Sequence, residues 1–265
     1  MKPTLLSVLL MLMPLLPGQA LVCLVYPDLP DVFYPQETET YYYPDLEEHD
    51  NIVWTSFPVV NDLYNQDDER YNNELTQMLE PYTFAVPPDD PLLAEFHWML
   101  RGDEDWAEYR DQVWTHPAHP ITPPYGYKLR FNTDDVFEIE LTGRLANAET
   151  DAVPLYSEND EEETYTNWLG YFHTQAQDAL DAFSREIPGD PGHTYLDYMY
   201  MIQTQKWTLV REEQEPGSPW VESPNHEPFK YALGYGDCVV VKVFANAPER
   251  LFWNTSEEVA AYVPE

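Results

Sequence analysis

The stretch "YKLRFNTDDVFEIEL" at residues 127–141 alternates apolar and charged side chains along two runs. If residues 132–136 form a turn, the apolar side chains face one another in the pairs Tyr127 with Leu141, Leu129 with Ile139 and Phe131 with Phe137. The same register places Arg130 opposite Glu138 and Lys128 opposite Glu140. Since one register satisfies both faces, the pattern predicts a β-hairpin with a solvated ladder of ion pairs.

Other segments favour strands or helices by the spacing of their apolar residues. Predicted strands are Ile52–Trp54, Phe57–Val60, Tyr195–Ile202, Trp207–Arg211 and Cys238–Phe244, with a Pro-rich loop from Glu212 to Pro228. Helical spacing with Gly102 as a stop predicts short helices at about 70–114, and a stripe from Trp168 to Phe183 predicts another at 165–186. The expected fold class is α+β and β-rich, with antiparallel strands in a sandwich-like arrangement.

The N-terminus is typical of a secreted protein. Lys2, an apolar run from Leu5 to Leu16 and the small residues around Ala20 predict a signal peptide over 1–20. We expect an acidic, Tyr- and Pro-rich extended arm over 21–50 and a globular body over 51–265, with a possible sub-boundary near 115–124. The predicted location is extracellular.

Secretion bears on two kinds of covalent modification. Cys23 and Cys238 are the only cysteines, and an oxidising compartment favours a disulfide between them; the alternative is two free buried thiols. Asn254-Thr255-Ser256 is an N-glycosylation sequon.

Charge narrows the class of partner. The chain has 48 acidic residues against 13 Lys and Arg, and no Lys or Arg lies between Lys2 and Arg70. Such a surface repels nucleic acid and anionic lipid and attracts basic proteins. A hydrophobic content of 43% argues against a wholly disordered acidic chain.

Tyrosines are concentrated where the acids are densest. Tyr41, Tyr42 and Tyr43 are followed by Asp45, Glu47 and Glu48. In composition the segment resembles the sulfated N-termini of chemokine receptors and the acidic tails of some thrombin inhibitors, which implies tyrosine sulfation. The alternative is an unmodified, solvated arm. We expect these six residues to form a partner-binding surface.

Catalytic signatures do not accompany this composition. The sequence has no HExxH, GxSxG, P-loop or GxGxxG motif, and His116 and His119 form its closest histidine pair. No catalytic residue, metal ligand or cofactor is assigned. The predicted function is capture of a basic extracellular protein, similar to a chemokine, a cytokine or a protease. The alternative is a secreted hydrolase that uses paired carboxylates.

Overall fold

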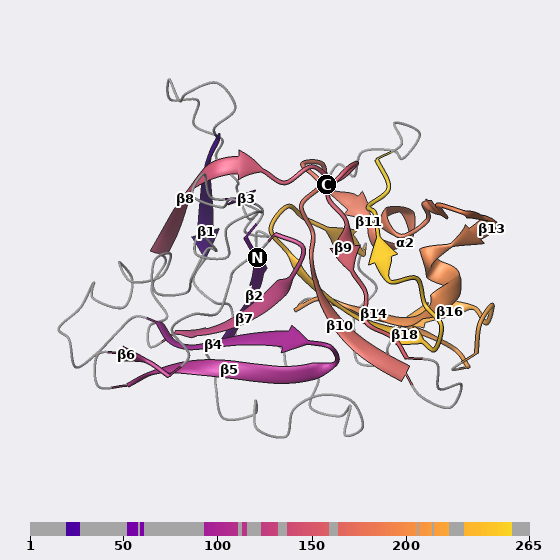
Figure 1. Ribbon diagram of the computed structural model, residues 1–265, viewed down its shortest axis with the longest axis horizontal. Helices are drawn as coiled ribbons and strands as arrows, with labels where there is room; N and C mark the ends of the chain where they lie inside the picture. The colour runs from indigo at the N-terminus through magenta and orange to yellow at the C-terminus, as the bar shows by residue number, and fades with distance from the viewer. Residues whose placement is uncertain are drawn as a thin grey trace, which may run out of the picture.

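The computed structural model describes residues 20–26, 52–57, 59–60, 93–110, 113–115, 123–131, 137–158, 164–205, 207–213, 215–222 and 231–255. These residues are mostly antiparallel strands in several sheets, with very little helix (Figure 1). The β-rich expectation is confirmed, whereas the α+β class and the sandwich are not.

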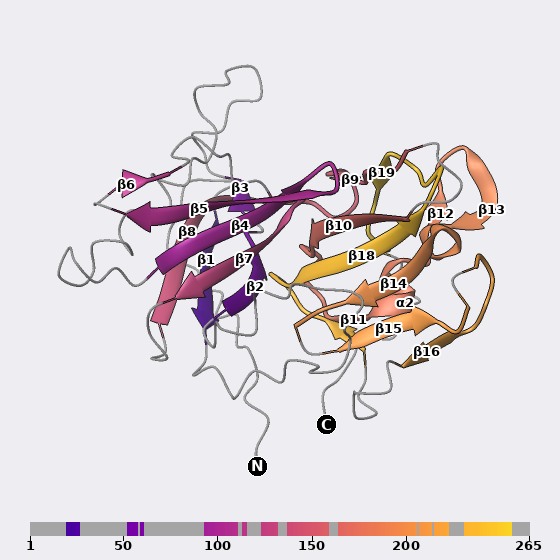
Figure 2. The same ribbon diagram turned by 90° about the horizontal axis from the view of Figure 1, so that it is seen from below.

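Two five-stranded sheets dominate the described residues. The first sheet has the order β2 (Ile52–Ser56), β7 (Gly126–Phe131), β4 (Leu93–Leu100), β5 (Asp103–Arg110) and β6 (Val113–Trp114). The second sheet has the order β10 (Thr164–Gly170), β18 (Cys238–Phe244), β14 (Met199–Gln203), β15 (Thr208–Arg211) and β16 (Trp220–Glu222). Both views show the two sheets next to each other, with β10 and β18 against β7 (Figures 1 and 2).

Smaller elements complete the described fold. A three-stranded sheet has the order β1 (Ala20–Tyr26), β8 (Phe137–Leu145) and β3 (Val59–Val60). Three strand pairs join β11 (Gln177–Asp178) to β17 (Ala232–Leu233), β12 (Glu186–Ile187) to β13 (Asp190–Thr194), and β9 (Val153–Pro154) to β19 (Arg250–Leu251). The helical segments are α2 (Ala179–Ala182) and the 3-10 turn η3 (Tyr195–Tyr198).

The predicted hairpin of residues 127–141 is wrong. β7 pairs with β2 on one side and with β4 on the other, so both of its edges are occupied. β8 instead pairs with β1 and β3 in the separate three-stranded sheet. The alternation specified which side chains share a face, but it did not specify the neighbouring strand, because β4 offers β7 an equally compatible apolar and charged pattern.

The helices predicted within 93–114 are also wrong, as is the first part of the helix predicted at 165–186, where β10 forms instead. Residues 93–110 form the β4–β5 hairpin, which is closed by a two-residue turn at Arg101 and Gly102 with φ angles of 53° and 83°. Positive φ at both central residues is the signature of a type I′ turn, whose twist matches antiparallel strands. Gly102 therefore closes a hairpin rather than a helix. Within 165–186 only α2 is α-helical, and its N-cap is Asp178, whose Oδ1 accepts from the Leu180 N–H at 2.9 Å. Residues 70–92 lie outside the described part.

Strand predictions in the second sheet agree better with the structure. Cys238–Phe244 coincides with β18, and Trp207–Arg211 overlaps β15. Tyr195–Ile202 divides into η3 and β14. The predicted loop Glu212–Pro228 contains β16, which pairs with β15.

Glycines allow the two sheets to approach closely. A Cβ atom on Gly126 would lie 2.4 Å from Cys238 Sγ, and one on Gly170 would lie 2.1 Å from the Pro123 carbonyl oxygen. Backbone bonds cross the same junction: the Gly170 N–H donates to the Pro124 carbonyl at 3.0 Å, and the Ser56 N–H donates to the Gly236 carbonyl at 2.7 Å. The junction thus excludes side chains at both glycines.

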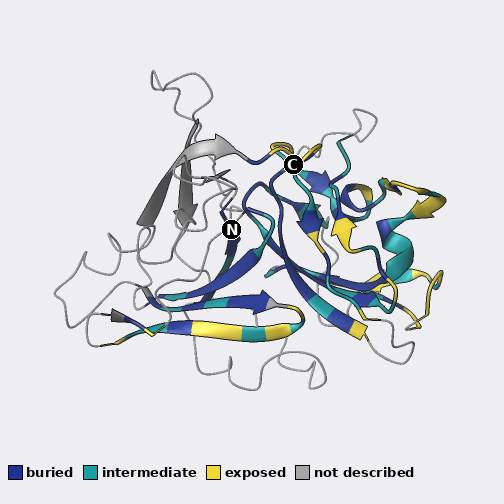
Figure 3. Ribbon diagram, viewed as in Figure 1, coloured by how far each residue is buried: buried dark blue, intermediate teal, exposed yellow. Residues whose placement is uncertain are grey.

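Figure 3 shows buried segments in both large sheets, and the buried residues of both sheets contribute to one apolar core. Its members from the two large sheets include Phe96, Tyr127, Leu129, Leu169, Val239 and Val241. β7 is buried on both faces except at Arg130. The face of β7 away from this core, with neighbouring side chains of β4 and β5, carries ion pairs that join Glu95, His97, Glu104 and Arg130.

Candidate functional site: a charged sheet face beside an acidic strand

One row of side chains crosses four strands of the first sheet. The strand register places Lys128 between Trp54 of β2 and His97 of β4, and His97 opposite Trp106 of β5. Side chains directly opposite each other in antiparallel strands lie on the same face. The row Trp54–Lys128–His97–Trp106 therefore places two basic side chains between two indole rings. We call this side of the sheet the charged face.

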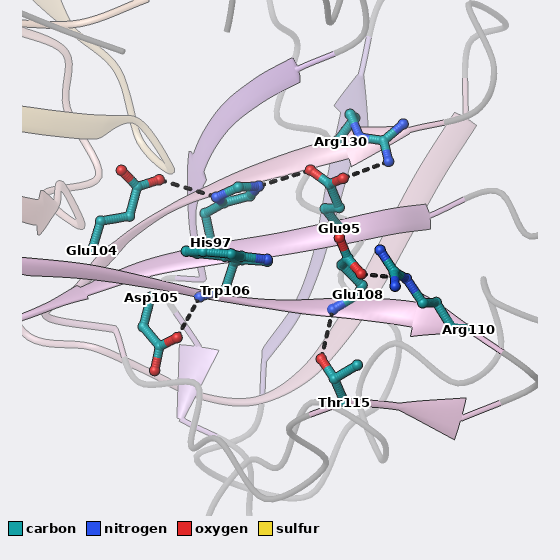
Figure 4. Close-up of polar contacts among 9 residues, drawn as sticks. All are labelled: Glu95, His97, Glu104, Asp105, Trp106, Glu108, Arg110, Thr115 and Arg130. Atoms are coloured by element: carbon teal, nitrogen blue, oxygen red, sulfur yellow. Dashed lines mark hydrogen bonds and ion pairs between the residues drawn. The ribbon is translucent and has the colours of Figure 1, made fainter. Parts of the chain in front are cut away.

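An ion-pair chain runs along the charged face beside this row (Figure 4). Arg130 Nη2 lies 2.6 Å from Glu95 Oε1, and the other oxygen of Glu95 lies 3.0 Å from His97 Nε2. The second ring nitrogen of His97 lies 3.0 Å from Glu104 Oε1. The four groups alternate in charge, and both imidazole nitrogens contact a carboxylate, an arrangement suited to the protonated ring.

The pKa values follow from this pairing. Burial alone would raise the pKa of Glu95, but hydrogen bonds from His97 and Arg130 outweigh it and lower the pKa to about 2. Burial alone would lower the pKa of His97, but hydrogen bonds to Glu104 and Glu95 outweigh it and raise the pKa above 6.5. Glu95 is thus ionised at neutral pH and the charged form of His97 is favoured. A carboxyl group with so low a pKa is poorly suited to donate a proton as a general acid.

Lys128 is completely buried beside this chain. Its Nζ lies 3.9 Å from the ring centroid of Trp54 and 4.1 Å from that of Trp168, which belongs to β10 of the second sheet. Burial lowers the pKa of Lys128 to about 7. The predicted solvated pairs with Glu140 and Glu138 are therefore wrong: Lys128 lies between indole rings at the sheet junction, and Arg130 pairs with Glu95.

The outer strand β5 carries acids and an exposed indole. Trp106 is 50% exposed, although its ring stacks against His97 with centroids 6.3 Å apart. Asp103 and Asp105 are exposed, and Glu104 and Glu108 are partly exposed. Together these five residues form what we call the acidic strand surface, in which an exposed indole shares a strand with carboxylates on both faces.

The backbone of this strand is also partly exposed at its outer edge. Among the described residues, β6 pairs only with Tyr109 and Arg110, and the ladder continues to Glu108, whose N–H donates to Thr115 Oγ1 at 3.0 Å. The next outward N–H, that of Trp106, donates to Asp105 Oδ1 at 2.9 Å (Figure 4). A carboxylate bonded to an edge N–H discourages strand pairing with another copy of the protein.

The structure tests few of the sequence-predicted site residues. Tyr41, Tyr42, Tyr43, Asp45, Glu47 and Glu48 lie outside the described residues, as do His116 and His119. Cys238 is a buried free thiol, and burial raises its pKa to about 12. Cys23 lies in β1 opposite Glu140, so the disulfide stays a prediction.

Asn254 has a defined environment. Its Nδ2 donates to the Asp181 carbonyl at 3.1 Å and to Ser184 Oγ at 3.0 Å. The neighbouring Trp253 is fully buried. A glycan on Nδ2 would have to be attached before these contacts form, and glycosylation stays a prediction.

Sequence reasoning missed the charged face, although a signal was present. In residues 94–98 polar Glu95 and His97 alternate with apolar Ala94, Phe96 and Trp98, which is the period of a strand. The helical interpretation of 93–114 assigned these residues the 3.6-residue period of a helix instead of the two-residue period of a strand.

No group of three or more His, Cys, Asp or Glu side chains among the described residues could hold a metal ion. No helix in the same part of the chain is long and apolar enough to cross a membrane. Comparisons with protein families, with curated proteins and with solved structures found no match for this chain. The chemistry of the described side chains is therefore the basis for any function assigned to it.

Proposed function

We propose that this chain is a secreted acidic protein that captures a basic extracellular protein, such as a chemokine, a cytokine or a protease. The observation that carries the proposal is the acidic strand surface, where half-exposed Trp106 shares one strand with four carboxylates, Glu104 and Glu108 on its own face and Asp103 and Asp105 on the other. The acidic tyrosine segment around Tyr41–Tyr43 would extend the same recognition.

Electrostatics supports this class of partner. The formal net charge of −35 gives a long-range field that accelerates the approach of a cationic protein. At contact, Asp103 and Asp105 are the most available carboxylates, because Glu104 contacts His97 and Glu108 pairs with Arg110. Trp106 supplies the apolar anchor, since indole rings often dominate binding energy and stack on cationic side chains.

The charged face holds this anchor in place. His97 stacks on one side of the indole and is itself held by Glu95 and Glu104. An indole fixed in this way loses little side-chain freedom when a partner binds, which favours affinity. We also propose that the two large sheets act together as a sandwich-like scaffold, supported by the apolar core to which both contribute.

A binding assay at two salt concentrations tests the proposal. The secreted chain is immobilised and exposed to a panel of basic chemokines, cytokines and proteases at low and high salt. We expect retention of a basic partner at low salt and strong weakening at high salt, because salt screens exposed charges. If no basic protein is retained at low salt, the proposed function is wrong.

A matched pair of variants tests the location of the site. Trp106→Ala should weaken capture at least about tenfold, the effect typical of a binding hot spot. Val221→Ala, which truncates the exposed apolar side chain of β16 in the second sheet, should leave capture unchanged. Equal affinities of wild type and Trp106→Ala, with both proteins folded by circular dichroism, would remove the acidic strand surface from the binding site.

A further inference from the structure

A pocket of about 290 Å³ lies where the β4–β5 turn meets the second sheet. Aromatic and apolar side chains form part of its walls, and polar groups contribute at least as much of its surface; the side chains that matter here are Met99, Arg101, Tyr125, Leu155, Tyr156 and Trp168. Ligand pockets characteristically combine such walls with a few polar groups, and this volume is near the lower end of their range. The pocket is distinct from the acidic strand surface.

Several contacts fix the walls of the pocket. The main chain of Tyr156 is held by Asn167, whose Oδ1 accepts from the Tyr156 N–H at 2.7 Å and whose Nδ2 donates to the Tyr156 carbonyl at 3.1 Å. The Tyr156 ring packs edge-on against Tyr165, with centroids 5.7 Å apart. A Cβ atom on Gly102 would lie 3.2 Å from this ring, so the turn lies directly against it. The pocket is therefore formed before any ligand enters.

Arg101 supplies the positive charge at this pocket. It occupies the first central position of the type I′ turn and is exposed, and no carboxylate of the described residues forms an ion pair with it. In contrast, Arg110 and Arg130 are paired with Glu108 and Glu95. Without an ion-pair partner among the described residues, Arg101 offers its planar set of donors to an external acceptor.

We propose that this pocket binds a small planar molecule that carries a carboxylate. Its ring would lie among Tyr125, Tyr156 and Trp168, and its carboxylate would accept two parallel hydrogen bonds from Arg101. Exposed charges farther than about 8 Å from the pocket are largely screened at physiological salt, so the carboxylates that oppose a bound anion are the nearby ones. Two carboxylates lie near the pocket. Asp103 directly follows the turn in the sequence, and Glu158 accepts a hydrogen bond from the Tyr156 hydroxyl.

Three probes that share one ring system test this inference on the full chain. Indole-3-acetate, indole and tryptamine differ chiefly in charge, and their binding can be measured by calorimetry and by NMR chemical-shift changes. We expect indole-3-acetate to bind most tightly. Stronger binding of tryptamine, or the absence of binding by all three probes, would overturn the proposal.

Two variants separate the role of Arg101 from that of net charge. Arg101→Gln should lower the affinity for indole-3-acetate at least about tenfold, to that of indole, by removing a charge-assisted pair. Arg110→Gln makes the same change of charge at the far end of β5, about 23 Å from Asp103 at about 3.3 Å per residue, and should leave the affinity unchanged. Equal affinities of Arg101→Gln and wild type, with dispersed NMR spectra showing that both are folded, would refute the assigned role.

Discussion

Replacing Lys128 with Met should abolish a pH dependence of the free energy of unfolding. Lys128 is fully buried between Trp54 and Trp168, and burial lowers its pKa from 10.5 to about 7. Met has a similar length and no charge, so it can fill the same space between the rings.

The direction and size of the effect follow from proton binding. Between pH 7 and pH 10.5 the unfolded chain keeps the proton on Lys128 while the folded chain releases it, so stability rises with pH in this window. From pH 7 to pH 9 the free energy of unfolding should increase by about 2 kcal/mol in wild type through this group alone. Below pH 7 both states are protonated, and the contribution no longer changes.

The two indole rings favour the charged form of Lys128 and so oppose the effect of burial on its pKa. A desolvated cation–π contact is worth about 2 kcal/mol, and Lys128 makes two of them. If these contacts held the ammonium charged throughout the window, the pKa would stay near its ordinary value and the pH dependence would vanish. We expect the cost of complete burial to prevail.

Urea denaturation of wild type and Lys128→Met at pH 7, 8 and 9 measures the difference. His97, whose raised pKa makes its contribution decline as pH rises, is present in both proteins and largely cancels. Lys242→Met is the matched control, because Lys242 also has a lowered pKa, of about 8, but is only half-buried in β18. Lys242→Met should retain the increase in the free energy of unfolding from pH 7 to pH 9 that Lys128 causes in wild type. Parallel pH profiles for wild type and Lys128→Met would refute the reasoning.

Three further substitutions, and one control, test the packing of the fold. Gly170→Ala should destabilise by about 3 kcal/mol or more in urea titrations, since its Cβ would lie 2.1 Å from a backbone oxygen, whereas Gly192→Ala meets no atom within 4 Å and should cost only its backbone strain. Arg211→Lys should cost about 2–3 kcal/mol in the same assay, because the guanidinium donates to three backbone carbonyls that one ammonium cannot reach together. Asp178→Ala should lower stability by about 1 kcal/mol through loss of the α2 N-cap, and an unchanged melting temperature would contradict this role.

The local sequence pattern was enough to predict part of the fold. β18 was predicted at its observed bounds, because a run of apolar, β-branched residues from Cys238 to Phe244 favours an extended chain wherever it lies. The β4–β5 hairpin carried a comparable signal, since Glu95 and His97 alternate with apolar neighbours. It was misread because Leu93, Phe96 and Leu100 also fit the spacing of a helix, and short apolar segments satisfy both periods.

The sequence by itself determined the acidic surface, the preference for strands and the face on which each side chain of β7 lies, since composition and the period of two are properties of the chain alone. Only the tertiary structure decided that β7 lies between β2 and β4 rather than beside β8. The same arrangement buried Lys128 between rings from two sheets and joined Glu95, His97 and Glu104 in one ion-pair chain. Strand partners depend on contacts between residues distant in sequence, and alternation along one strand is equally compatible with several neighbours.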